Sequence, residues 1–233
     1  MLKRKKLLPV IKKVLLPWNY ESLWAGCILL TIAHAISSAN SPEFSYEHSW
    51  DEISYNAQDS SGTIGTITFH EGCCVGAVRS DYSPRRYEKV VEAANYLTGA
   101  EPEIFDLAQR ETFQYLLDDV NGKTKPVITA AFWGDENGIY AVEDEHVLSE
   151  NGIQLFRIQL MEFADAIEAV REQYDDLNNR QIDLLISLYK KAIDTPEGKI
   201  KLTNEEVNII NAADIDGINA SKELFAGVGI EWP

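Results

Sequence analysis

Three residues that commonly bind metal ions lie close together in the sequence. His70, Cys73 and Cys74 form the densest such group in the chain. A zinc site needs about four ligands, and this stretch offers three. Neighbouring residues on a strand point to opposite faces, so Cys73 and Cys74 would bind one ion only if the turn were distorted. We therefore expect no cofactor and no metal, and keep these three residues as the candidates if a metal binds.

A second stretch, residues 143–146, has the residue types of acid–base catalysis. On an extended segment, Asp144 and His146 share a face, so the carboxylate could orient the imidazole. A solvated strand edge that uses charge to block pairing explains the same residues. The sequence contains no nucleophile elbow, phosphate-binding loop, dinucleotide glycine pattern or H-E-x-x-H motif. We therefore favour a protein without enzymatic activity. A small-molecule hydrolase or metal-dependent enzyme that uses Asp144 and His146 is the alternative.

A run of carboxylates follows one face of the predicted helix at residues 153–177. We call this set the acidic row; its members are Glu162, Asp165, Glu168, Glu172, Asp175 and Asp176. A charge run of this kind is usually a solvated helix face. As part of a binding surface, it would present carboxylates to lysine and arginine side chains. Trp133 and Tyr140, if exposed, would serve as apolar anchors beside it.

The charge of the whole chain decides which partners are compatible with it. Among 233 residues there are 21 basic and 37 acidic ones, and the formal net charge is -16. Six of the bases lie within residues 1–16, so the remainder carries about -22. Such a body repels nucleic acid phosphates, which argues against DNA or RNA binding. It attracts basic proteins instead, although acidity that serves only solubility is the competing explanation.

The N-terminal forty residues allow several interpretations. Residues 1–16 combine lysines with leucines, so this basic arm could lie on a membrane surface or fold back onto the acidic body. The apolar stretch that follows, residues 23–36, would rise only about 21 Å as a helix, short of a roughly 30 Å hydrocarbon layer. We expect a buried helix capped by Asn19 or Ser22. A signal anchor or a cleaved signal peptide remains the alternative.

The cysteine pattern bears on the cellular compartment. The count of three is odd, and two of the cysteines are adjacent in sequence, which is unfavourable for a disulfide framework. We therefore expect a cytoplasmic protein, with membrane anchoring or secretion as alternatives.

Hydrophobic periodicity predicts the remaining elements. Three β-rich runs between residues 53 and 78 are separated by turn residues and predict an antiparallel meander. Asn137-Gly138 predicts a hairpin between runs 127–133 and 139–142. Helices are expected from Pro84, from Pro102, over 153–177, over 182–193, after a capping box at Thr203, and from Ser221.

These elements indicate an α+β fold with an antiparallel sheet, made of a meander plus a hairpin, packed against helices. A C-terminal helical hairpin and further short helices would pack on the sheet. The expected parts are the basic arm at 1–16, a sheet-containing part at 17–152 and a helical part at 153–233.

The functional hypothesis rests on the charge of the body. An acidic α+β protein without a catalytic constellation fits an inhibitor or immunity-type protein, which would neutralise a basic partner such as a nuclease-like toxin by occlusion. The alternatives are an enzyme that uses the Asp144 and His146 region and a membrane-surface protein anchored by residues 1–16.

Overall fold

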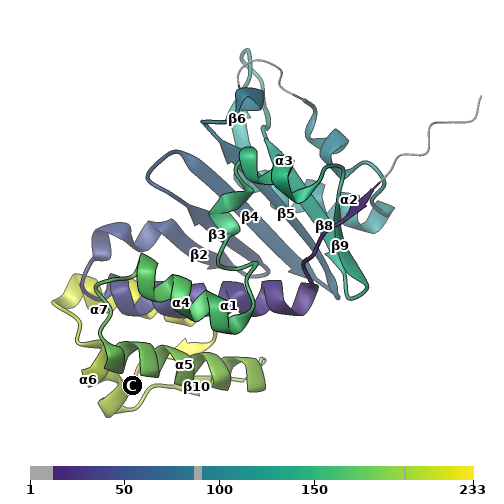
Figure 1. The fold of residues 1–233 in the computed structure, drawn as a ribbon. Helices are drawn as coiled ribbons and strands as arrows, with labels where there is room; N and C mark the ends of the chain where they lie inside the picture. The colour runs from purple at the N-terminus through teal and green to yellow at the C-terminus, as the bar shows by residue number, and fades with distance from the viewer. Residues whose placement is uncertain (1–12, 87–90, 197) are drawn as a thin grey trace, which may run out of the picture.

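A seven-stranded antiparallel sheet forms the centre of the fold (Figure 1). The computed structural model describes residues 13–86, 91–196 and 198–233. Residues 1–12 of the basic arm and residues 87–90 of the helix predicted from Pro84 lie outside the described residues. The strand order is β1-β9-β8-β5-β4-β3-β2. The strands are β1 (Val14–Leu15), β2 (His48–Asp51), β3 (Ser54–Gln58), β4 (Thr63–His70), β5 (Cys73–Ser80), β8 (Ala130–Asp135) and β9 (Gly138–Ala141).

The predicted meander and hairpin are both confirmed. Strands β3, β4 and β5 pair in sequence order, and β8 pairs with β9 across the Asn137-Gly138 turn. The sheet gains two edge strands that the sequence did not suggest. β2 pairs with β3, and β1, at the end of the basic arm, pairs with β9 so that Val14 lies opposite Ala141.

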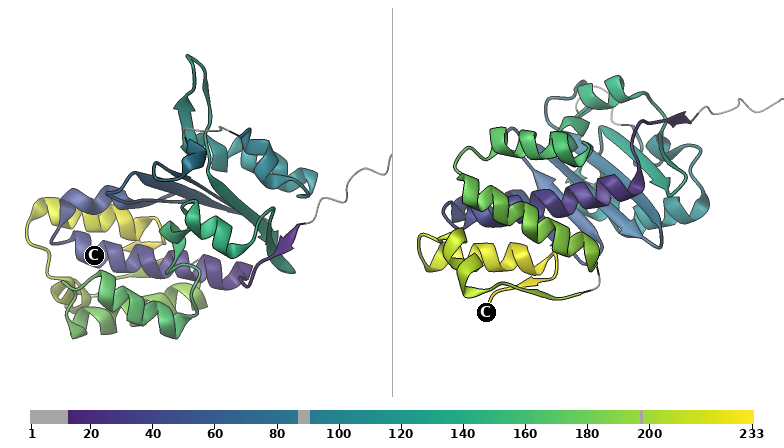
Figure 2. Two further views of the ribbon diagram at one scale, coloured as in Figure 1. Left: turned by 45° about the horizontal axis from the view of Figure 1, so that its top comes forward. Right: turned by 60° about the horizontal axis from the view of Figure 1, so that its bottom comes forward.

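Helix α1 (Tyr20–Ser38) crosses one face of the sheet (Figure 2). It begins where predicted, because the Asn19 side chain accepts a hydrogen bond from the Ser22 backbone N–H at 2.7 Å. The helix is apolar on nearly all sides and is buried on nearly all sides from Leu23 onward. Among the described residues, α1 is the one helix that is long and apolar enough to cross a membrane. Within its most apolar 18 residues, 72% is buried in the fold. A core helix and an N-terminal signal sequence both meet this criterion.

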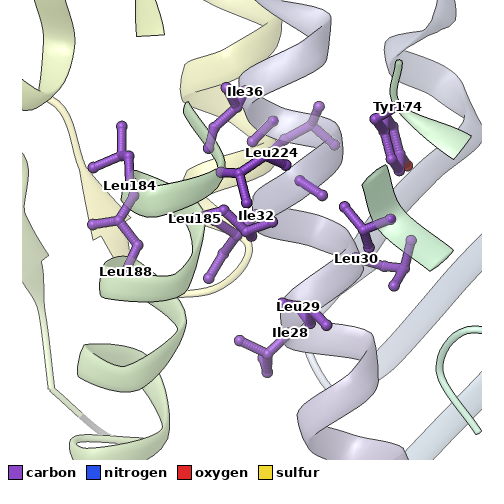
Figure 3. Close-up of a cluster of buried hydrophobic side chains, with 14 of the residues drawn as sticks. Ile28, Leu29, Leu30, Ile32, Ile36, Tyr174, Leu184, Leu185, Leu188 and Leu224 are labelled. Carbon is purple, nitrogen blue, oxygen red and sulfur yellow. The ribbon is translucent and has the colours of Figure 1, made fainter. Parts of the chain in front are cut away.

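A layer of C-terminal helices covers the outer side of α1. It comprises α4 (Phe163–Gln173), α5 (Asn179–Asp194), α6 (Asn204–Ile210) and α7 (Ile215–Ala226). The capping box predicted at Thr203 opens α6, while α7 begins six residues earlier than expected. Figure 3 shows the cluster of leucines and isoleucines from α1, α5 and α7 at the centre of this layer. Helices α4, α5 and α7 pack on α1, which lies between them and the sheet, and α6 packs on α5, so the layer is not packed directly on the sheet as the sequence suggested.

Short helical segments cover the opposite face of the sheet. These are η3 (Ala93–Leu97), α2 (Pro102–Arg110) and η4 (Thr112–Leu116), which bury a separate apolar cluster with the sheet. The start of α2 agrees with the prediction from Pro102. From Pro84, the described residues show only the short segments η2 (Pro84–Arg86) and η3, so the long helix predicted there is wrong in its described parts.

The remaining elements are short. They are η1 (Pro42–Glu47), α3 (Glu145–Glu150), η5 (Ile153–Phe156), an antiparallel pair of β6 (Leu117–Asp119) with β7 (Thr124–Pro126), and a parallel pair of β10 (Ile200–Lys201) with β11 (Ile230–Glu231).

The single helix predicted over 153–177 is wrong. The chain forms η5, then turns through residues 157–162, and only then enters α4. The turn brings the backbone of Gln159 against Gly26 of α1, where a side chain would have no room. The apolar residues whose spacing predicted one helix are consequently divided: Phe156 packs against the sheet, whereas Ile167 packs in the helical layer.

Candidate functional site

The two aromatic residues expected beside the acidic row lie elsewhere. Trp133 has only 1% of its surface exposed and belongs to the apolar cluster that η3, α2 and η4 bury on the sheet, so its prediction as an exposed anchor is wrong. Tyr140 lies opposite Trp133 on β9 and is half-buried, with the Lys13 ammonium 4.1 Å from its ring centroid. The acidic row belongs to the helical layer beyond the other face of the sheet, so neither aromatic residue adjoins it.

The acid–base candidates are not arranged for catalysis. Residues 145–150 form α3, not an extended segment, and Asp144 is its N-cap, accepting a hydrogen bond from the Val147 backbone N–H at 3.0 Å. The His146 side chain is 82% exposed and lies 3.5 Å from the Glu150 carboxylate. Since His146 points into solvent and Asp144 caps the helix, the two side chains do not converge on a cleft.

The metal candidates are separated by the strand geometry. His70 and Cys73 face each other across the β4–β5 turn, while Cys74 is fully buried on the other face of the sheet. Among the described residues, no group of three or more His, Cys, Asp or Glu side chains is arranged to hold a metal ion. The three residues therefore do not form a joint ligand set.

The acidic row is exposed along its whole length. Glu162 is the N-cap residue of α4, Asp165, Glu168 and Glu172 lie on its exposed face, and Asp175 and Asp176 lie on the loop after it. In the described part of the chain, the one ion pair of the row joins Glu168 to Arg171 at 4.0 Å, and exposed pairs of this kind contribute little stability. Most of the negative charge on this face is therefore available to a ligand.

An apolar pocket of about 410 Å³ opens at the start of α4, where α1, α4 and α5 meet. Its walls are mainly aromatic and aliphatic and include Tyr20, Trp24, Leu29, Met161, Phe163 and Tyr189. The rings of Phe163 and Tyr189 stack with centroids 4.8 Å apart. Because Phe163 is 37% exposed, part of this aromatic wall is open to solvent.

Two carboxylates border the apolar pocket. Glu21, in the first turn of α1, and Glu162, at the start of the acidic row, both line it, and no lysine or arginine is among its described lining residues. Burial raises the pKa of Tyr189, and the nearby Glu162 carboxylate raises it further, which places that negative charge close to the stacked rings. The pocket thus combines an apolar floor with an acidic border, which suits an apolar side chain flanked by cations.

The sequence analysis missed the residues that build this pocket. Phe163 follows Glu162 directly, but its place among the regularly spaced apolar residues of the helix predicted over 153–177 indicated a buried residue. Trp24 and Tyr189 lie far apart in the sequence, and nothing in the local pattern shows that α1 and α5 bring them together. Comparison of the chain with protein-family models, with curated proteins and with solved structures finds no match.

Proposed function

We propose that this chain is an acidic protein-binding module that captures a basic protein partner through α4 and the apolar pocket beside it. The observation that carries the proposal is the continuity of the two: Glu162 belongs both to the pocket and to the acidic row. An aromatic or aliphatic side chain of the partner would enter the pocket, and flanking lysines or arginines would meet the carboxylates of α4.

The carboxylates and the apolar pocket are expected to act on different rate constants of binding. Exposed carboxylates steer a basic partner and accelerate association, whereas a desolvated apolar anchor slows dissociation. Occlusion of the partner's functional surface would make the module an inhibitor of the immunity-protein type, acting on a nuclease-like toxin in the cytoplasm. The burial of α1 within the fold supports a core role for this helix.

The two rival functions have less support. The positions of Asp144 and His146 favour a cap and a solvated side chain over an active site. A membrane anchor formed by the basic arm depends on residues 1–12, which lie outside the described residues. The strand β1 and the contact of Lys13 with Tyr140 place the end of the arm at the edge of the sheet.

Site-specific photo-crosslinking identifies the partner and tests where it binds. A photoreactive amino acid at position 164, an exposed alanine on α4, should crosslink to a basic protein in extracts of the native host. The same amino acid at position 136, in the β8–β9 turn, serves as the control. Equal crosslinking of the same partner from both positions, or a partner that is not basic, would contradict the proposal.

Charge-reversal variants then test whether association depends on the carboxylates of α4 or only on the net charge of the protein. The triple variant Asp165→Lys, Glu168→Lys, Glu172→Lys should slow association with the purified partner at least tenfold at low salt. A control variant with the same formal charge change, Asp106→Lys, Glu136→Lys, Glu145→Lys, places the substitutions at exposed positions away from α4. This control variant should associate with the partner at close to the wild-type rate.

The apolar anchor is tested through the dissociation rate, and the inhibitory role through the activity of the bound partner. Phe163→Ala should raise the dissociation rate at least tenfold with little effect on association. Added salt should slow association far more than it changes dissociation. Equal rate losses in the two charge variants, salt-independent capture, or a partner that stays fully active in the complex would refute the proposed function.

A further inference from the structure

A second pocket lies at the opposite end of α4, where α1 ends. It has a volume of about 310 Å³ and opens between the last turn of α1, the η1 segment and the loop that follows α4. We call it the α1-end pocket. Its lining includes Ser37, Ser38, Phe44, Glu47, Asp175 and Asp176, so the last two carboxylates of the acidic row belong to it. α4 is about 16 Å long, which sets the spacing between this pocket and the apolar one.

The lining of the α1-end pocket has an excess of negative charge. Glu47, Asp175 and Asp176 contribute three carboxyl groups, and no lysine or arginine is among the described lining residues. None of the three forms an ion pair with another described residue, and Asp176 accepts one hydrogen bond, from the Ser37 hydroxyl at 2.9 Å. Burial raises the pKa of Glu47, and the negative charge of Asp59 raises it further, so a cation that entered the pocket would be favoured.

The end of α1 contributes to the same electrostatic preference. The C-terminus of a helix is the negative end of its macrodipole, and the last turn of α1 contains no basic residue to compensate it. Ser38, which lines the pocket, has 1% of its surface exposed, and its hydroxyl oxygen has no hydrogen-bond partner among the described residues. A buried hydroxyl without a partner is costly, and a ligand with N–H groups would satisfy it.

The walls of the pocket are suited to a flat cation. Phe44 is 47% exposed at the mouth, and Tyr174 lies deeper, so two aromatic rings line a site that carries carboxylates. Guanidinium is planar, stacks on aromatic faces and donates up to five hydrogen bonds, whereas ammonium is a compact and strongly hydrated charge. His34 also lines the pocket, and burial lowers its pKa to about 4, so it adds no positive charge at neutral pH.

We infer that the α1-end pocket binds the guanidinium group of an arginine side chain presented by the basic partner. This inference rests on the proposed function and extends it: the partner would place an apolar residue in the pocket at the start of α4 and an arginine in the pocket at its end. Asp176 and Glu47 would accept the guanidinium hydrogen bonds, and Phe44 would stack on its face.

Titration with a blocked amino acid tests the pocket directly. The probe is N-acetyl-arginine methylamide, followed by the amide chemical shifts of the isotopically labelled protein. Shift changes should concentrate at Ser37, Phe44 and Asp176 and should saturate at millimolar probe. The citrulline analogue has the same shape without the charge and should leave these signals unchanged. Equal shifts with citrulline, or arginine-induced shifts confined to other regions, would overturn the inference.

Matched variants locate the interaction. Asp176→Asn and Glu47→Gln should each weaken binding of the arginine probe at least fivefold. Asp165→Asn removes a carboxylate from the same row outside the pocket and should change binding less than twofold. Agmatine, a free guanidinium amine, distinguishes the source of the group. If agmatine binds more than tenfold more tightly than the blocked arginine, the pocket serves a small molecule and the partner-arginine assignment is wrong.

The two proposals can fail separately. If crosslinking from position 164 yields a basic partner but the arginine probe does not bind, the binding module stands and this inference fails. If the probe binds as expected but no basic partner crosslinks, the proposed function fails while the guanidinium site remains.

Discussion

The imidazole rings of His34 on α1 and His48 on β2 lie with their centroids 4.5 Å apart in the interior of the fold. They are 3% and 6% exposed. The Tyr174 hydroxyl, at the end of α4, is 3.4 Å from His34 Nδ1 and 3.5 Å from His48 Nε2. This cluster joins the central helix, the edge of the sheet and the C-terminal layer, so its protonation state bears on the stability of the whole fold.

Acid should destabilise the protein through these histidines. Burial lowers the pKa of His34 to about 4, and burial together with the neighbouring His34 lowers that of His48 well below its ordinary value. Between pH 6.5 and 4 the folded state therefore binds fewer protons than the unfolded state, so the free energy of unfolding falls as the pH falls. For His34 alone the loss amounts to roughly 3 kcal/mol across this range.

Urea unfolding at pH 7 and pH 5 measures this effect. His34→Gln should make the stability difference between the two pH values smaller than in the wild type. His146→Gln changes a histidine that is 82% exposed and should leave the difference as it is. An unchanged pH dependence in His34→Gln would show that His34 is not a source of the acid sensitivity.

Tyr55→Phe should destabilise the fold by about 1–3 kcal/mol, because it removes one hydroxyl that serves two buried partners. The Tyr55 hydroxyl lies 2.6 Å from His48 Nδ1 and accepts a hydrogen bond from the Gln159 side-chain amide at 2.8 Å. Tyr82→Phe, at a side chain with 76% exposure, is the control and should cost less than 0.5 kcal/mol. Equal midpoints in urea for the two variants would contradict this account.

The fold was predictable from sequence wherever a local signal was sufficient. The Asn19 cap, the Thr203 capping box and the Asn137-Gly138 turn each satisfy backbone groups within a few residues, and each appears in the structure. Periodicity was less reliable over 153–177. There, a packing contact between Gly26 and Gln159, 133 positions apart, decides that the chain turns and does not continue as a helix.

The sequence predicted the exposed carboxylates of the candidate site but not the pocket beside them. The acidic row is exposed as predicted, because the spacing of polar residues along an amphipathic helix shows which face meets solvent. Trp133 was misassigned because sequence pattern does not show what covers each face of a sheet. Its face is covered by η3, α2 and η4. The apolar pocket depends on three helices that meet only in the tertiary structure.

Gly26→Ala should destabilise the fold by about 1–3 kcal/mol, because the added methyl group would overlap the backbone of Gln159. Backbone atoms cannot move aside as the end of a flexible side chain can, so α1 or the 157–162 turn must shift. Ala25→Ser, at the neighbouring half-buried position, acts mainly through helix propensity and should cost about 0.5 kcal/mol. Thermal unfolding followed by circular dichroism compares the two variants, and a Gly26→Ala protein as stable as wild type would contradict the close packing.

The three cysteines should differ sharply in reactivity towards Ellman's reagent. Cys27 and Cys74 are fully buried, and burial raises the pKa of both thiols, so neither access nor thiolate formation favours reaction. Cys73 is half-buried, and its pKa is raised first by burial and then by the nearby carboxylates of Asp135 and Glu103. One thiol per chain should therefore react in the native protein, more slowly than free cysteine. All three should react in concentrated guanidinium chloride, and Cys73→Ser should abolish the native reaction. Release of two or three equivalents from the folded wild type would show that the sheet interior around Cys74, or the α1 packing around Cys27, opens far more readily than this structure indicates.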